Sequence, residues 1–143
     1  MLLRADDSIE FAFPGIHRDA VLRIDFQSTL RVPDDGQRHY LPPGLGRFPL
    51  REVDELDPAR VPEAWLRRGG VVMPMWQAEA CWLNFSSPHD YPFLLKVAAG
   101  KINAVNGAPW RNEPDFDRQD YVEVPGQPWL DGFRMDERTV RQF

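Results

Sequence analysis

The sequence has little of the chemistry that marks enzymes and metal proteins at first sight. Of its 143 residues, one is a cysteine, Cys81, and three are histidines, His17, His39 and His89. A single cysteine excludes an intrachain disulfide and a zinc site built from several thiolates. No two histidines stand at the short spacings of a metal-binding pair, so we expect neither a metal nor a cofactor.

Long apolar runs and clusters of basic residues are missing as well. No segment approaches the roughly 18 apolar residues of a membrane-spanning helix, and the N-terminal "MLLRADDSIEF" lacks the apolar stretch of a signal peptide. The net charge of -5 and the pI of about 5.1 argue against nucleic-acid binding, which depends on a basic surface. Together with the lone cysteine, these features predict a cytoplasmic protein that does not bind membranes.

Strand patterns are clearest near the N-terminus. In "AVLRIDFQSTLRV" (20–32), apolar and polar residues alternate, which is the period of a half-buried strand. The same alternation occurs in "SIEFAF" (8–13), and the intervening "PGIHRD" is typical of a turn. These segments therefore predict an antiparallel hairpin.

Prolines and glycines interrupt the chain throughout, 14 and 10 of them, which favours short elements joined by turns. Residues 33–50 are expected to form a loop. After it, Asp57 has the character of a helix cap, and "VPEAWLRRGG" predicts one or two helical turns that begin near Pro62 and end at Gly69.

Charge nearly disappears between Gly69 and Trp110, so this block is expected to hold the core. A strand is predicted for "MWQAEACWLNF" (75–85), although a helix fits residues 76–84 too. In "FLLKVAAGKINAV" (93–105), apolar residues fit both a helical and a strand period. A central strand is preferred there because Gly100 lies inside the segment.

The fold class that follows is mainly β with minor α, as an antiparallel β-sandwich or a partly open barrel. The alternative is an α+β fold in which residues 93–105 form a helix on the sheet. A length of 143 residues predicts one domain, 1–143, whose last strand, in "TVRQF", ends at the C-terminus.

Four residues are candidates for a catalytic site because carboxylates and imidazoles move protons: Glu79, His89, Asp90 and Asp131. Glu79 stands alone in an apolar block, and an ion pair with an arginine is its expected structural role. Cys81 lies among apolar residues, so we interpret it as a buried and inert thiol.

Five tryptophans are many for this length. Exposed indole rings beside amides and carboxylates are typical of sugar-binding grooves and of protein interfaces. The candidate ligand-binding residues are therefore Trp110, Gln127, Trp129 and Asp131. The structural alternative is that the tryptophans close the ends of a small β core.

Three segments, "GVVMPMWQAEACWLNF", "KINAVNG" and "QPWLDGF", resemble a family of uncharacterised bacterial proteins. The resemblance runs from about residue 25 to the end of the chain, and it implies no activity. It also implies that family members continue past "TVRQF", so this chain would be a short member or a fragment.

Three functional hypotheses follow. The preferred one is a non-catalytic binding or assembly module whose partner is another protein or another copy of itself, since a terminal strand leaves a free edge. The alternatives are a hydrolase with a carboxylate and histidine site, and a domain that binds a small ligand or carbohydrate.

Overall fold

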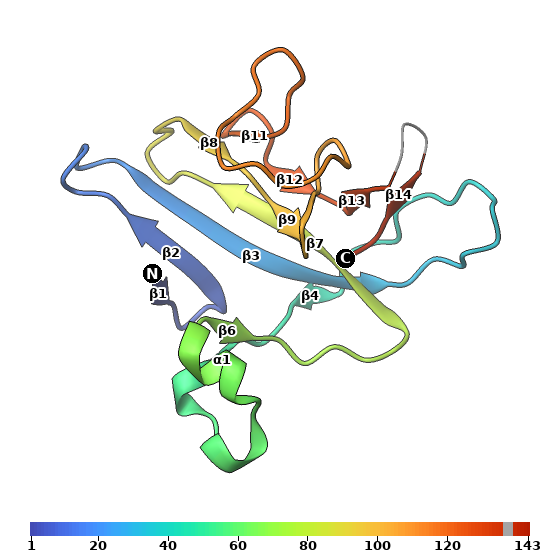
Figure 1. The fold of residues 1–143 in the computed structure, drawn as a ribbon, viewed down its shortest axis with the longest axis horizontal. Helices are drawn as coiled ribbons and strands as arrows, with labels where there is room; N and C mark the ends of the chain where they lie inside the picture. Colours follow the sequence, from blue (N-terminus) through green and yellow to red (C-terminus); the bar gives the residue numbers. More distant parts are fainter. Residues whose placement is uncertain (136–138) are drawn as a thin grey trace.

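The computed structural model describes residues 1–135 and 139–143, and its principal element is an open antiparallel sheet (Figure 1). Five strands follow one another in the order β1-β2-β3-β7-β12, and β4 pairs with the free part of β3. Their bounds are β1 (Leu2–Leu3), β2 (Ser8–Ala12), β3 (Val21–Leu30), β4 (Gly46–Arg47), β7 (Glu79–Ser86) and β12 (Trp129–Leu130).

The pairing of β3 with β7 is the longest in the molecule's described part and runs from Arg23 opposite Ser86 to Leu30 opposite Glu79. This register places Ile24 opposite Phe85 and Phe26 opposite Leu83. Residues opposite each other in an antiparallel pair share a face, so the apolar positions of both strands form one apolar face. The strand predicted for 20–32 is confirmed as Val21–Leu30, and its alternation holds from Leu22 to Phe26. At the end of the strand the burial is the reverse of the one predicted, because Thr29 is buried and Leu30 is exposed.

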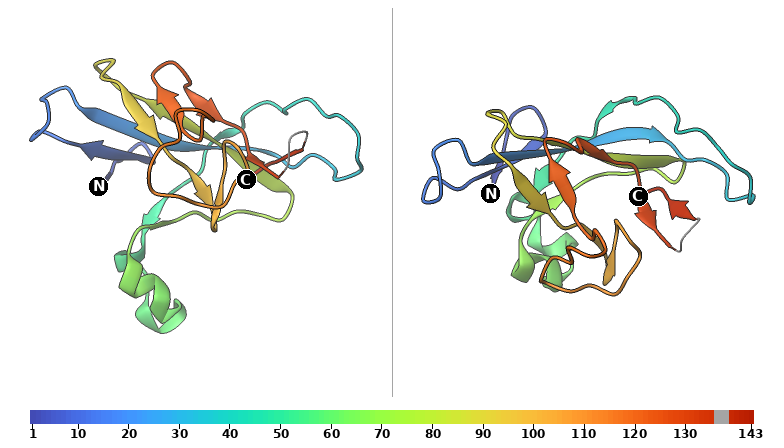
Figure 2. Two further views of the ribbon diagram at one scale, coloured as in Figure 1. Left: turned by 45° about the horizontal axis from the view of Figure 1, so that its top comes forward. Right: turned by 90° about the horizontal axis from the view of Figure 1, so that it is seen from above.

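A second layer of two-stranded sheets covers only that apolar face. The right view of Figure 2 shows these small sheets on one side of the central sheet. They pair β8 (Phe93–Leu95) with β11 (Val122–Val124), and β9 (Ala98–Ala99) with β10 (Ile102–Asn103). The buried core between the layers consists of Leu22, Leu83, Phe85, Val122 and Val124.

The remaining elements are peripheral. The segment with the helices extends away from the sheet (Figure 1) and contains β5 (Arg51–Glu52), η1 (Val53–Glu55), η2 (Pro58–Arg60), α1 (Glu63–Arg68) and β6 (Val71–Val72). The Asp57 side chain accepts a hydrogen bond from the Ala59 N–H, which is the predicted cap. Near the C-terminus, β13 (Phe133–Arg134) pairs with β14 (Val140–Arg141).

The mainly β prediction with minor α is therefore confirmed, and the described strands do not close into a barrel. The α+β alternative is wrong, because residues 93–105 form β8, β9 and β10 in place of a helix. Gly100 lies between β9 and β10 with a φ of 65°, a conformation that suits a turn and that non-glycine residues avoid. The strand preferred for this segment is thus divided into short pieces.

The folded chain exposes more surface than its mass predicts. Its solvent-accessible surface is 10137 Å² for a mass of 16.5 kDa. A compact monomer of that mass exposes about 7,600 Å². The difference, about 2,500 Å², arises from a sheet that carries a second layer on one face only and from segments that extend away from it.

We predict that Phe85→Ala lowers the free energy of unfolding by about 3–5 kcal/mol, because Phe85 is 2% exposed and fills the space between the two layers. Urea denaturation followed by circular dichroism measures the change. Leu2→Ala on the exposed edge strand β1 is the control and should cost much less. Equal losses for both variants would contradict the assigned core.

Candidate interaction surface

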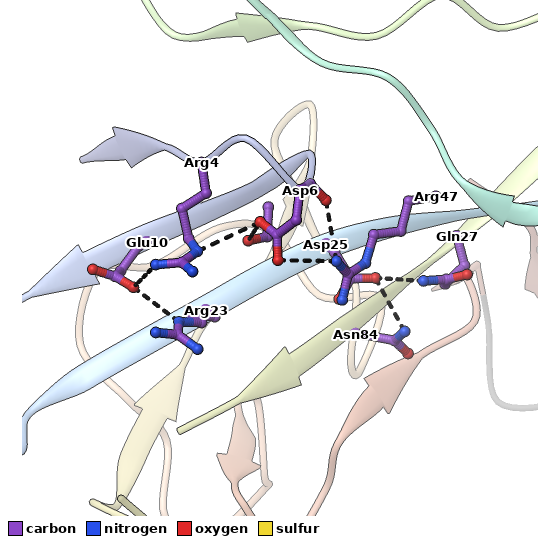
Figure 3. Close-up of polar contacts among 9 residues, drawn as sticks. Arg4, Asp6, Glu10, Arg23, Asp25, Gln27, Arg47 and Asn84 are labelled. Carbon is purple, nitrogen blue, oxygen red and sulfur yellow. Dashed lines mark hydrogen bonds and ion pairs between the residues drawn. The ribbon is translucent and has the colours of Figure 1, made fainter. Parts of the chain in front are cut away.

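The uncovered face of the central sheet carries a network of charged and amide side chains (Figure 3). Glu10 receives the Arg23 Nε–H at 2.8 Å and the Arg4 Nη1–H at 3.0 Å. The hydrogen bond from Arg23 is the main reason that the pKa of Glu10 lies below its usual value. This carboxylate is therefore ionised and paired at neutral pH.

Asp25 occupies the centre of the same network. Its Oδ1 accepts hydrogen bonds from Gln27 Nε2 at 2.7 Å and from Asn84 Nδ2 at 3.1 Å. The guanidinium of Arg47 lies 3.5 Å from its Oδ2. Since its acceptors are engaged from β3, β7 and β4, Asp25 holds these strands together and is not placed to bind a ligand.

The loop after β3 folds back over the other half of this face. The Thr29 hydroxyl lies 3.1 Å from the carbonyl oxygens of Pro42 and Pro43, which accounts for its complete burial. A Cβ on Gly44 would stand 3.0 Å from the Trp82 ring. The loop thus packs closely on this half of the sheet and covers Thr29 and Trp82.

Glu79 has partners of a different kind from the one expected. Its carboxylate accepts hydrogen bonds from the Ser28 hydroxyl at 3.3 Å and from the Trp76 N–H at 2.8 Å. No arginine among the described residues forms an ion pair with Glu79. The arginine partner that the sequence predicted is therefore not found among them. The Glu79 N–H also bonds the Trp76 carbonyl, and the side chain closes that turn.

The other catalytic candidates lie elsewhere. His89 and Asp90 belong to the turn that follows β7, where the Asp90 N–H donates to the Ser87 carbonyl at 3.0 Å. The length of β7 separates this turn from Glu79 by roughly 23 Å, at about 3.3 Å per residue. Asp131 is exposed in the turn after β12. The four candidates therefore form no common site.

The candidate ligand-binding residues are also dispersed. Trp129 is 62% exposed and stands opposite Asn84, hence on the uncovered face, whereas Trp110 follows β10 in the covering layer. The Gln127 Oε1 is occupied by the Gln119 side chain and the Glu123 N–H. Trp110 and Trp129 do not line one groove, and a ligand role for either stays a prediction.

Beside Trp110 lies a buried ion pair between Lys96 and Asp120, whose side chains are 11% and 7% exposed. The Lys96 ammonium also donates to the Glu113 carbonyl at 2.7 Å and lies 5.2 Å from the centre of the Trp110 ring. Burial alone would raise the pKa of Asp120, but the Asp115 N–H and the Lys96 ammonium outweigh it and hold that pKa below its usual value. The cluster fastens the loop before β11 to the covering layer.

An apolar groove remains beside β8. Two adjoining hollows of about 470 Å³ and 250 Å³ share Pro92, Phe93 and Leu94 as walls. We call them together the β8 groove, and the other lining residues are Phe13, Ile16, Ala20, Tyr91, Glu123, Val124, Pro125 and Gly126. Glu123 is its one charged wall residue among those described.

Aromatic rings form part of the walls of the β8 groove, and two of its aliphatic side chains are exposed to solvent. The Phe93 ring lies 6.0 Å from that of Phe13 and 5.4 Å from that of Tyr91, between centroids. Ile16 is 72% exposed and Leu94 is 50% exposed. Apolar groups that face water in one place are typical of interaction surfaces.

Sequence reasoning missed this surface because residues 69–110 were expected to be core. One signal was present: three apolar residues in a row on a single strand place an apolar side chain on each face. Phe93 and Leu95 pack inward, and Leu94 therefore points outward.

Comparisons of the chain with protein-family models, with curated proteins and with solved structures found no match. The resemblance to an uncharacterised bacterial family stays a prediction. No helix of the described chain is long and apolar enough to span a membrane. Within residues 1–135 and 139–143, no cluster of histidine, cysteine and acidic side chains has the makings of a metal site.

Asp120→Asn should destabilise the protein by about 3 kcal/mol at pH 7, because it leaves the Lys96 ammonium buried without its counter-charge. The stabilisation from Asp120 is complete above the pKa of an unfolded Asp, about 3.9, and is lost as the pH falls through the lower folded value. The difference in unfolding free energy between wild type and variant should therefore close below about pH 4. Asp117→Asn, at an exposed position in the same loop, is the control, and a difference that persisted at low pH would contradict the ion pair.

Cys81 should not react with thiol reagents in the folded protein. Burial raises the pKa of its thiol to about 11, so almost no thiolate exists at pH 8. We predict full reaction with an aromatic disulfide reagent only after unfolding in urea, measured by absorbance. Rapid reaction of the native chain would contradict the burial of Cys81.

Proposed function

We propose that this chain is a non-catalytic assembly module that acts through protein–protein contacts, with a second copy of itself as the partner. The observation that carries the proposal is the solvent-accessible surface of 10137 Å². A stable interface of standard size hides about 800 Å² on each partner, and permanent homodimers hide more. The excess of about 2,500 Å² over a compact monomer is larger than the area that such an interface hides.

The distribution of side chains favours the β8 groove as the place of contact. On the polar face of the sheet, arginines, carboxylates and amides already bind one another. A partner on that face would remove water from these charged groups without giving them new hydrogen bonds, which costs free energy. The β8 groove has mainly apolar and aromatic walls, and its burial costs little desolvation. Interface centres are depleted of charge and enriched in aromatic residues.

The ionisable groups support a role without catalysis. A general acid needs a pKa raised towards neutrality, whereas the pKa values of Glu10 and Asp120 are lowered by their partners. A nucleophilic cysteine needs a lowered pKa, and burial raises that of Cys81. One buried free thiol also suits a reducing compartment, so we place the protein in the cytoplasm.

Light scattering coupled to size-exclusion chromatography tests the proposal over a concentration series. The expected mass is twice 16.5 kDa at high concentration, falling towards one chain on dilution. Asp117→Asn serves as a surface control that should leave the mass unchanged. A strict monomer at every concentration would overturn the proposed self-association.

A further inference from the structure

The backbone of β8 has an unused edge. In an antiparallel pair, residues alternate between positions whose N–H and C=O groups face the partner strand and positions whose groups face away. Glu123, opposite Leu94, directs its N–H to the Gln127 side chain and its C=O to the Gln127 N–H. The pair is therefore of the second kind, and Leu94 directs its own N–H and C=O away from β11.

No strand of the described chain occupies that side of β8, since β8 and β11 form a sheet of two. The smaller hollow lies there, between Leu94 and the β2–β3 turn with Phe13 and Ile16. An unpaired donor and acceptor thus stand beside an exposed apolar hollow. This combination suits the addition of another strand, where backbone bonds give affinity and apolar side chains fill the hollow.

We propose that two copies of this chain associate by antiparallel pairing of β8 with β8 of the second copy, about a two-fold axis at Leu94. The inference rests on the proposed function and adds the site to it. Antiparallel pairing of a strand with itself is the arrangement that a two-fold axis produces, with each residue meeting its symmetry partner. Leu94 then faces Leu94 of the other chain, and Phe93 faces Leu95.

The three-residue strand alone is too short to hold a dimer, so the β8 groove supplies the rest of the contact. The walls on both sides of Leu94 are apolar, and the pairing would bring the exposed Phe13, Ile16 and Leu94 of each copy into one patch. The edges of the central sheet suit pairing less well. Strands β1 and β12 have two residues each, and the charged Glu10 lies opposite Leu2 beside the β1 edge.

Cysteine cross-linking tests the pairing directly. In a hydrogen-bonded antiparallel pair, opposite Cα atoms lie about 5.5 Å apart, a separation that a disulfide spans. Leu94→Cys should therefore give a disulfide-linked dimer on mild oxidation, seen in non-reducing electrophoresis. Leu2→Cys, at an exposed leucine on the edge strand β1, is the matched control and should remain monomeric in the gel, as should the wild type with its buried Cys81.

A charge swap at the same position gives a second readout. Leu94→Lys and Leu94→Glu each place like charges across the axis, and either should weaken association at least about tenfold. Mixing the two variants should restore association, because Lys then faces Glu. Leu2→Lys should behave as the wild type. Circular dichroism should be unchanged in all variants, since these side chains point into solvent.

The outcomes separate this inference from the proposed function. A wild-type dimer in which Leu94→Cys gives no cross-link and Leu94→Lys associates as tightly as the wild type would overturn the β8 pairing and leave self-association standing. Weakening by both charges without rescue on mixing would place Leu94 in the interface but contradict the two-fold pairing. A monomeric wild type would overturn both proposals.

Discussion

The pairing of β3 with β7 decides which side chains of the central sheet face the core. Its register, Ile24 opposite Phe85 and Phe26 opposite Leu83, gathers the apolar residues of both strands on one face. If β3 slipped by one residue, Ile24 and Phe26 would turn to the other face of the sheet and Asp25 would enter the core. Strands β2 and β4 then attach to β3, and β12 attaches to β7, so every other strand of the sheet takes its position from this pair.

The two faces created by this register differ in what stabilises them. On the polar face, the charged half satisfies itself through carboxylates such as Asp25, which receives donors from three strands (Figure 3), whereas the loop after β3 covers the half with Thr29 and Trp82. The apolar face needs a cover, and the cover consists of strands only two or three residues long. Such short strands leave an edge and apolar walls exposed at Leu94, where the β8 groove lies.

The sequence was sufficient where the solvent lies on one side of a strand. The alternation in 8–13 and 20–32 predicted the β2–β3 hairpin, because a strand with one face buried has apolar and polar residues in turn. It was insufficient for 93–105, where apolar neighbours fit two periods. Glu79 shows the same limit for sites: its partner Ser28 is 51 residues away, and residue type alone could not tell a turn closure from an ion pair. The exposed edge of β8 depends on which strands lie beside it, and no local pattern records that.

In a single chain β8 is an edge strand, and in the proposed dimer it becomes an inner strand. Hydrogen exchange measured by NMR at several protein concentrations tests it at one amide, that of Leu94. Exchange at the Leu94 amide should slow markedly as the protein concentration rises, whereas exchange at amides of the β3–β7 pair, which are protected within each chain, should stay constant. A Leu94 amide that exchanges equally fast at all concentrations, while the mass of the particle doubles, would contradict it.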